Sequence, residues 1–119
     1  MTTSANASAA PTSATLPSAE QPVVLVVRFR AQPDGEAALQ TRLLEMAHKT
    51  ITEPGCLRYD IHQDESDARH FILLESWEDQ ESLEAHMHAH HVQAFLADLP
   101  GLTSQDIKML RLRCLKHRE

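Results

Sequence analysis

Basic residues are in the minority in this 119-residue chain. Lys plus Arg number 11 against 17 for Asp plus Glu, which gives a formal net charge of -6 at pH 7. A protein that binds nucleic acid needs a basic face to meet the phosphates. The one locally basic segment, residues 108–118, would divide its charges between the two faces of a strand. We therefore expect no nucleic-acid partner.

Long apolar runs and cysteine motifs are also lacking. No apolar run approaches the ~20 residues that a membrane-spanning helix requires. The N-terminus lacks the basic and apolar regions of a signal peptide. The two cysteines, Cys56 and Cys114, have neither CxxC spacing nor the density of a disulfide scaffold. These features predict a cytoplasmic globular protein with no membrane partner.

The N-terminal composition defines the domain boundaries. Of the first 22 residues, 17 are Ser, Ala, Thr or Pro, and only Glu20 is charged. Such a segment buries too little apolar surface to offset the entropy lost on ordering. We expect a disordered tail over residues 1–22, one folded domain over residues 23–115, and a short C-terminal tail over residues 116–119.

The first half of the domain predicts a strand followed by a helix. Residues 23–30 are rich in β-branched side chains, which favours a buried strand. Asp34 is placed to cap a helix that begins near Glu36 and ends at the Glu53-Pro54-Gly55 breaker. Residues at helical spacing form its inner face: Leu39, Leu43, Met46 and Thr50. Leu44, Ala47 and Ile51 would widen this face.

The second half predicts a hairpin, a helix and a final strand. Residues 56–63 and 69–77 have strand length and are joined by a longer polar loop. Leu57, Tyr59 and Ile61 share a face of the first strand, and Phe71, Leu73, Glu75 and Trp77 share a face of the second. Asp79 is placed to cap one continuous helix whose inner face comprises Leu83, His86, Met87, His90, Ala94 and Phe95. Residues 99–101 end that helix, and residues 107–115 form the last strand.

The order β-α-β-β-α-β predicts an α+β, ferredoxin-like fold with an antiparallel sheet. Two helices cover one face of such a sheet. The strands nevertheless carry apolar residues on both faces, for example Val24 and Val26, Ile72 and Leu74, and Leu110 and Leu112. A second copy of the same sheet would bury the other face, so we expect a homodimer.

Three segments carry a resemblance to a known family: residues 53–60 (EPGCLRYD), 71–79 (FILLESWED) and 83–91 (LEAHMHAHH). The chain resembles the antibiotic biosynthesis monooxygenase family, and in particular its quinol-monooxygenase-like members in the dimeric α/β-barrel superfamily. This resemblance implies a dimeric α/β barrel with one active site per subunit, between the helices and the sheet. His86 and His91 match the family's helical histidines. Ala89-His90 stands where Thr-Pro is typical, which predicts a weaker bend.

The resemblance implies chemistry that needs no resident cofactor. An unperturbed histidine pKa of about 6.5 lets His86 take a proton from a quinol or a phenol near neutral pH. The deprotonated substrate is electron-rich enough to react with O2 directly. No GxGxxG motif follows a strand. We expect His86 and His91 to be catalytic, although both also fit the role of hydrogen-bonded buried histidines.

The expected substrate-binding residues lie near these histidines in the predicted fold, and each is also consistent with a purely structural role. They are Tyr59, Phe71, Glu75, Trp77, His90, Phe95 and Arg28. His86 and His90, one helical turn apart, would be able to hold a metal with Glu75 or His91. The chain has no HExxH motif and its family resemblance implies no metal, so we expect none.

Two other functions stay open, and a third is disfavoured. An isomerase of a small phosphorylated carbonyl compound would use the histidines as proton shuttles and Arg28, Arg30 or Lys49 to hold the phosphate. Haem degradation in a related branch requires an asparagine on the first strand and a helical tryptophan, which are missing here. The second open function is that of a non-catalytic dimeric binding or stress protein.

Overall fold

The computed structural model of the chain describes residues 21–116. The predicted N-terminal tail, apart from its last two residues, and residues 117–119 of the predicted C-terminal tail lie outside this range. The elements follow the chain as β2 (Val23–Arg30), α1 (Glu36–Thr50), β3 (Cys56–Asp64), β4 (Asp67–Trp77), α2 (Gln80–Met87), α3 (His90–Leu102) and β5 (Lys108–Leu112). No helix among these is long and apolar enough to cross a membrane.

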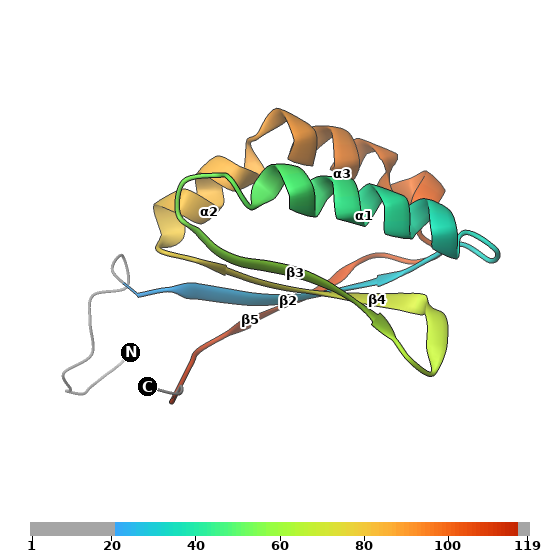
Figure 1. The fold of residues 1–119 in the computed structure, drawn as a ribbon, viewed down its shortest axis with the longest axis horizontal. Helices are drawn as coiled ribbons and strands as arrows, with labels where there is room; N and C mark the ends of the chain where they lie inside the picture. Colours follow the sequence, from blue (N-terminus) through green and yellow to red (C-terminus); the bar gives the residue numbers. More distant parts are fainter. Residues whose placement is uncertain (1–20, 117–119) are drawn as a thin grey trace.

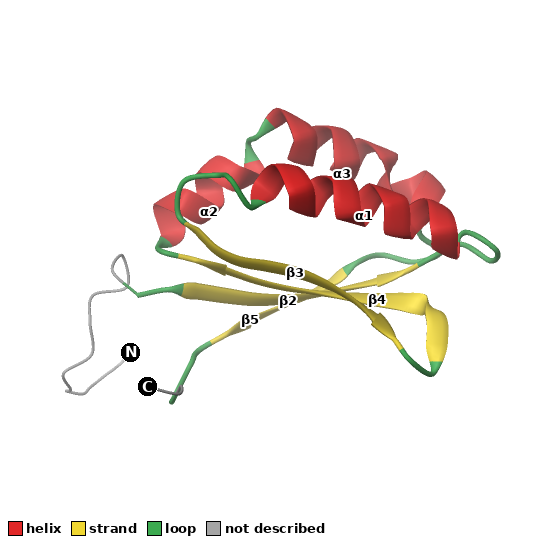
Figure 2. Cartoon of the chain, in the orientation of Figure 1, coloured by secondary structure: helices red, strands yellow, loops and turns green. Residues whose placement is uncertain are grey.

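The four strands form one antiparallel sheet in the order β3-β4-β2-β5. All three helices lie on the same side of this sheet (Figures 1 and 2). The split arrangement, in which β2 lies between β4 and β5, confirms the predicted ferredoxin-like fold.

The core lies between the helices and the inner face of the sheet. In β2, and in β4 from Phe71 to Trp77, every second side chain is buried, as period-two alternation requires. Phe29 pairs with Phe71 and Val27 with Leu73 across the two central strands. The predicted α1 stripe is confirmed by the burial of Leu39, Leu43, Met46 and Thr50.

Two predicted details of α1 are wrong. Leu44 and Ile51 are exposed, because each follows a buried residue by one position and so lies about 100° further round the helix. Asp34 does not cap α1, since Gly35 is the N-cap residue and no side chain caps it. The turn in which Gly35 N–H donates to the Gln32 carbonyl places Asp34 one residue too early, with a left-handed φ of 63°.

The β3–β4 hairpin is tighter than predicted. Only two residues separate Asp64 from Asp67, which pair across the strands. The Asp64 carboxylate accepts hydrogen bonds of 2.8 Å from the backbone N–H and the hydroxyl of Ser66, and so closes the turn. Leu57 does not share the buried face with Tyr59, because a bulge between Cys56 and Arg58 shifts the register. Leu57 is therefore exposed.

The predicted second helix is divided into α2 and α3. Ala89 has an extended backbone with φ -65° and ψ 144°, and α3 starts afresh at His90. The break occurs although Ala89-His90 stands in place of Thr-Pro. Because the break changes the helical phase, His90 and Ala94 are exposed and do not line the inner face, whereas Phe95 is buried.

The C-terminal boundaries also differ from the prediction. Pro100 lies inside α3, which continues to Leu102. A proline in the last turn gives up one hydrogen bond, and the Thr103 N–H still donates to the Leu99 carbonyl at 2.9 Å. The last strand spans Lys108–Leu112, shorter than predicted, and pairs only with β2.

Candidate functional site

His86 reaches the core because α2 begins at a well-defined cap. The Asp79 carboxylate accepts a 2.8 Å hydrogen bond from the backbone N–H of Ser82, as predicted. The cap fixes the phase of the helix, so that Leu83 and His86 face the sheet. His86 is only 2% exposed, whereas His88 is exposed as predicted.

The turn after α1 lies against the start of α2. Gly55 has a φ of +83°, and a Cβ there would collide with the Ser82 side chain. The Gly55 carbonyl accepts a 2.8 Å hydrogen bond from Glu78 N–H, and Glu53 N–H donates to the Thr50 carbonyl at 2.9 Å. These contacts hold Glu53 beside His86.

Glu53 links two histidines. Its Oε2 lies 3.1 Å from Nδ1 of His86 and 2.8 Å from Nε2 of His91. The same nitrogen of His91 lies 3.1 Å from the hydroxyl of buried Thr50. The Glu53 and His91 side chains are 16% and 18% exposed, so these two are more exposed than His86.

Two aromatic rings enclose the imidazole of His86. The Trp77 ring lies 4.6 Å from it, centroid to centroid, in a tilted arrangement, and the Tyr59 ring lies 5.5 Å away edge-on. Trp77 and Tyr59 are both buried. The result is a dry aromatic environment with a titratable nitrogen base inside it.

Burial dominates the electrostatics of this cluster. Desolvation lowers the pKa of His86, against the hydrogen bond and the charge of Glu53, which raise it. Desolvation also raises the pKa of Tyr59, so the phenol stays protonated. Near neutral pH His86 is therefore a neutral base beside a neutral phenol.

Glu75 extends the cluster along β4. It pairs with Tyr59 across the strands, and its carboxylate accepts a 2.7 Å hydrogen bond from the indole N–H of Trp77. Burial raises the pKa of Glu75, the Trp77 hydrogen bond opposes that shift, and the charge of Glu53 adds to it. Glu75 thereby holds the Trp77 ring in position against His86.

Within the described range 21–116, one group of side chains is arranged so that it could hold a metal ion: Glu53, His86 and His91. Their ligand atoms lie within 4.8 Å of one another. Two histidines and a carboxylate are a common ligand set for zinc and iron. Nδ1 of His86, however, is hydrogen-bonded to the Glu53 carboxylate, and Nε2 of His91 is hydrogen-bonded to the Thr50 hydroxyl. Both nitrogens thus have partners within the protein.

The structure brings together five of the predicted site residues: Tyr59, Glu75, Trp77, His86 and His91. It does not place the others there. His90 is exposed because α3 begins at this residue. Phe71 and Phe95 pack at the other end of the core, where the Phe95 ring meets Phe29 edge-on at 6.0 Å.

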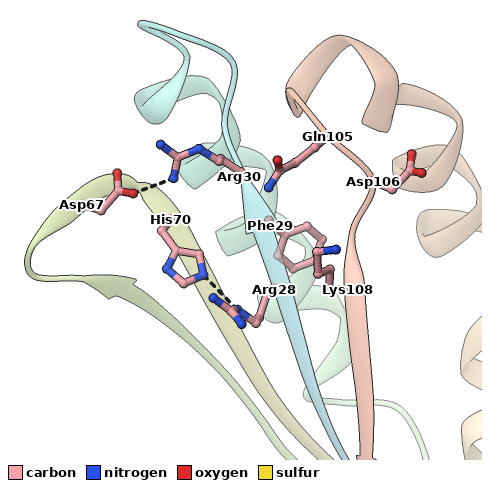
Figure 3. A pocket seen from close by; sticks show the side chains of 8 residues that line it. All are labelled: Arg28, Phe29, Arg30, Asp67, His70, Gln105, Asp106 and Lys108. Carbon is pink, nitrogen blue, oxygen red and sulfur yellow. Dashed lines mark hydrogen bonds and ion pairs between the residues drawn. The ribbon is translucent and has the colours of Figure 1, made fainter.

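Arg28 lies on the opposite face of the sheet from His86, since its neighbours Val27 and Phe29 face the helices. It lines a separate cavity of about 220 Å³ with Arg30, His70 and Lys108 (Figure 3). Arg28 Nε donates to His70 Nε2 at 3.1 Å, and Arg30 pairs with Asp67. Arg28 and Arg30 are thus not placed to bind a phosphate at His86.

Lys49, the third cation considered for a phosphate, lines a second hollow, of about 370 Å³, on the outer face of α1. Arg28, Arg30 and Lys49 are thus not members of the His86 cluster.

Glu53 and Thr50 were not predicted as site residues. Thr50 was recognised as a buried position of α1, and Glu53 only as part of the Glu53-Pro54-Gly55 helix terminator. The one available signal was that this turn belongs to the segments that carry the family resemblance.

Comparisons with known proteins agree with this architecture. A sequence model described as antibiotic biosynthesis monooxygenase matches residues 22–98. PA3566 from Pseudomonas aeruginosa is 32% identical to this chain in sequence. Its crystal structure superposes with a TM-score of 0.77, and the match covers 82% of this chain and 98% of that one. Rv0793 from Mycobacterium tuberculosis is 25% identical with a TM-score of 0.78, covering 83% and 100%.

A curated relative, an uncharacterized protein of Synechocystis sp., is 23% identical over 96 residues. The match covers 79% of this chain and 65% of the relative. This chain thus spans less than two thirds of that relative's length.

Proposed function

Since the chain belongs to the antibiotic biosynthesis monooxygenase family, we propose that it is an enzyme that oxidises a quinol or a phenol with O2, without a resident cofactor. The observation that carries this proposal is the buried imidazole of His86 between the rings of Trp77 and Tyr59. A base in a dry aromatic pocket is what the deprotonation of a phenolic substrate requires.

The first step is a proton transfer. The substrate O–H bond breaks, the proton goes to Nε2 of His86, and the electron pair stays on the substrate oxygen. Nε2 is the nitrogen for this step because Nδ1 faces Glu53. Burial lowers the pKa of His86 and keeps it neutral and able to accept a proton near neutral pH. The resulting phenolate then gives an electron to O2.

The same cluster provides for binding. Trp77 and Tyr59 surround the base with aromatic rings, which favours an aromatic substrate beside it. Tyr59, whose pKa burial raises, keeps its hydroxyl proton and can donate it to a substrate oxygen. The substrate enters on the side of Glu53 and His91, the more exposed members of the cluster.

We further propose that the functional unit is a homodimer built on the outer face of the sheet. The helices leave this face bare (Figure 1). Val26 pairs with Leu74 on one side and with Leu110 on the other, and all three point outward. Leu110 is 58% exposed, and a second sheet would remove this apolar surface from water.

Oxygen uptake with a panel of quinols and phenols tests the proposal. His86→Ala should lower substrate-dependent uptake at least tenfold, because loss of a general base typically costs about 10²–10⁴ in rate. His88→Ala is the matched control: it removes an exposed histidine two residues away and should leave uptake unchanged.

Equal losses in both variants, or full turnover by His86→Ala, would assign the base to another residue, with His91 the next candidate. If the wild-type protein oxidises no member of the panel, the non-catalytic binding function is favoured instead.

A further inference from the structure

The Glu53 carboxylate faces two histidines through different ring nitrogens. It meets Nδ1 of His86 at 3.1 Å and Nε2 of His91 at 2.8 Å. An ionised carboxylate can only accept hydrogen bonds, and a neutral imidazole carries one N–H. The hydrogen bond from His86 therefore places its hydrogen on Nδ1, and the bare nitrogen of His86 is Nε2. Nε2 of His91 is hydrogen-bonded to the Thr50 hydroxyl and lies at ion-pair distance from Glu53.

We propose that Glu53 is the positioning residue of this site, holding His86 in the tautomer with its proton on Nδ1, so that His86 presents a bare Nε2 to the substrate. The catalytic consequence rests on the proposed function, whereas the tautomer itself does not. Glu53 touches no reacting atom, and it acts through His86.

The backbone around Glu53 is built to keep its carboxylate in place. Glu53 lies between Thr50, the buried last residue of α1, and Gly55, whose backbone packs on Ser82 of α2. Its own N–H donates to Thr50, and the carbonyl of Gly55 accepts from Glu78. Glu53 therefore has little freedom to turn away from His86, and α1 and α2 are joined at the site.

The charge of Glu53 matters when His86 takes a proton. The imidazole then becomes a cation with almost no access to water, which is costly unless an opposite charge lies beside it. Glu53 supplies that charge at hydrogen-bond distance. The proton stays on Nε2 of His86, and Glu53 neither gains nor loses one.

Long-range ¹H–¹⁵N NMR of the wild-type histidines tests this directly, because bare and protonated ring nitrogens resonate far apart. At a pH where His86 is neutral, we expect this ring to carry its proton on Nδ1. In Glu53→Leu, which has no acceptor, His86 should lose its single tautomer. The matched control is Glu84→Gln, which alters an exposed carboxylate on α2 and should change neither ring.

Glu53→Gln separates charge from packing. Gln can still accept a hydrogen bond, but the carboxylate charge that raises the pKa of His86 is gone, so this pKa should fall further. If the substitution merely loosened the site and admitted water, the pKa would rise towards its ordinary value. We also expect kcat for substrate oxidation to fall at least tenfold with little change in KM.

A wild-type His86 with its proton on Nε2, an unchanged His86 tautomer in Glu53→Leu, or an unchanged or raised pKa in Glu53→Gln would overturn the assignment. These NMR results stand whether or not the protein oxidises any quinol. A failure of the proposed function is therefore distinct from a failure of this inference.

Discussion

Glu75 is an acidic side chain in the core, and its surroundings explain why it is tolerated. The carboxylate is buried, and its partner is the indole N–H of Trp77 at 2.7 Å. A buried charge is disfavoured, so desolvation raises the pKa of Glu75 above its usual value. The residue contributes a hydrogen bond that fixes Trp77, and the cost is a pH-dependent loss of stability.

The sign of that dependence follows from the raised pKa. Below the pKa of the unfolded chain both states are protonated, and the neutral carboxyl carries no desolvation penalty. As the pH rises through the higher pKa of the folded state, the folded protein releases this proton to water and keeps a negative charge in a buried site, and stability falls. Glu75 therefore stabilises the fold less at alkaline than at acidic pH.

Glu75→Gln should remove this dependence, because the amide oxygen can still accept from Trp77 and no charge is buried. We expect the variant to gain stability over the wild-type protein at pH 8 and to match it near pH 4, in urea unfolding followed by circular dichroism. Glu75→Leu should be less stable than both at every pH, since it leaves the indole N–H without its acceptor. An equal effect of Glu75→Gln at both pH values would contradict this account.

From the sequence, the buried side chains of each element could be predicted more accurately than the contacts between elements. Burial of His86, Glu75 and Trp77 follows from the period of one helix and one strand. The contact of Glu53 with His86 joins residues 33 positions apart, and no local pattern encodes it. His90 was expected on the inner face and is exposed instead, whereas His91 lies beside Glu53. This difference has a local cause, because the break at Ala89 changes the helical phase.

At the scale of elements, the α1–β3 turn decides how the site is assembled. Gly55 has a left-handed backbone and lies where a side chain would collide with Ser82. The resemblance-bearing segment that begins at Glu53 thus contains a steric requirement as well as a helix terminator. The contact of this segment with α2 could not be predicted from the sequence, because it joins residues that are far apart in the chain.

Gly55→Ala should destabilise the protein by about 1–3 kcal/mol, because it combines an unfavourable φ with a collision. Gly101→Ala is the control. Gly101 lies in α3 with open space around the position of a Cβ, so alanine there should raise stability by about 0.5–1 kcal/mol. Urea midpoints of the two variants should move in opposite directions. A Gly55→Ala variant as stable as the wild-type protein would show that the turn is not held against α2.

At the scale of the whole molecule, the sheet has two unlike faces. One is covered by α1, α2 and α3, and carries the His86 cluster (Figure 1). The other presents Val26, Leu74 and Leu110 in neighbouring strands, and none of α1, α2 and α3 lies over them. The sequence predicted this second apolar face from alternation alone.

The expected partner is a second copy, and a charge placed in the middle of the outer face tests this. Val26→Glu introduces a carboxylate between Leu74 and Leu110, where burial in an interface would be costly. Sedimentation of the wild-type protein at micromolar concentration should give a species of about twice the 13.3 kDa chain mass, and the variant should sediment as a monomer. Leu44→Glu, on the exposed side of α1, should leave the dimer intact. A 13 kDa wild-type species would contradict the dimer, and unchanged association of Val26→Glu would place the interface elsewhere.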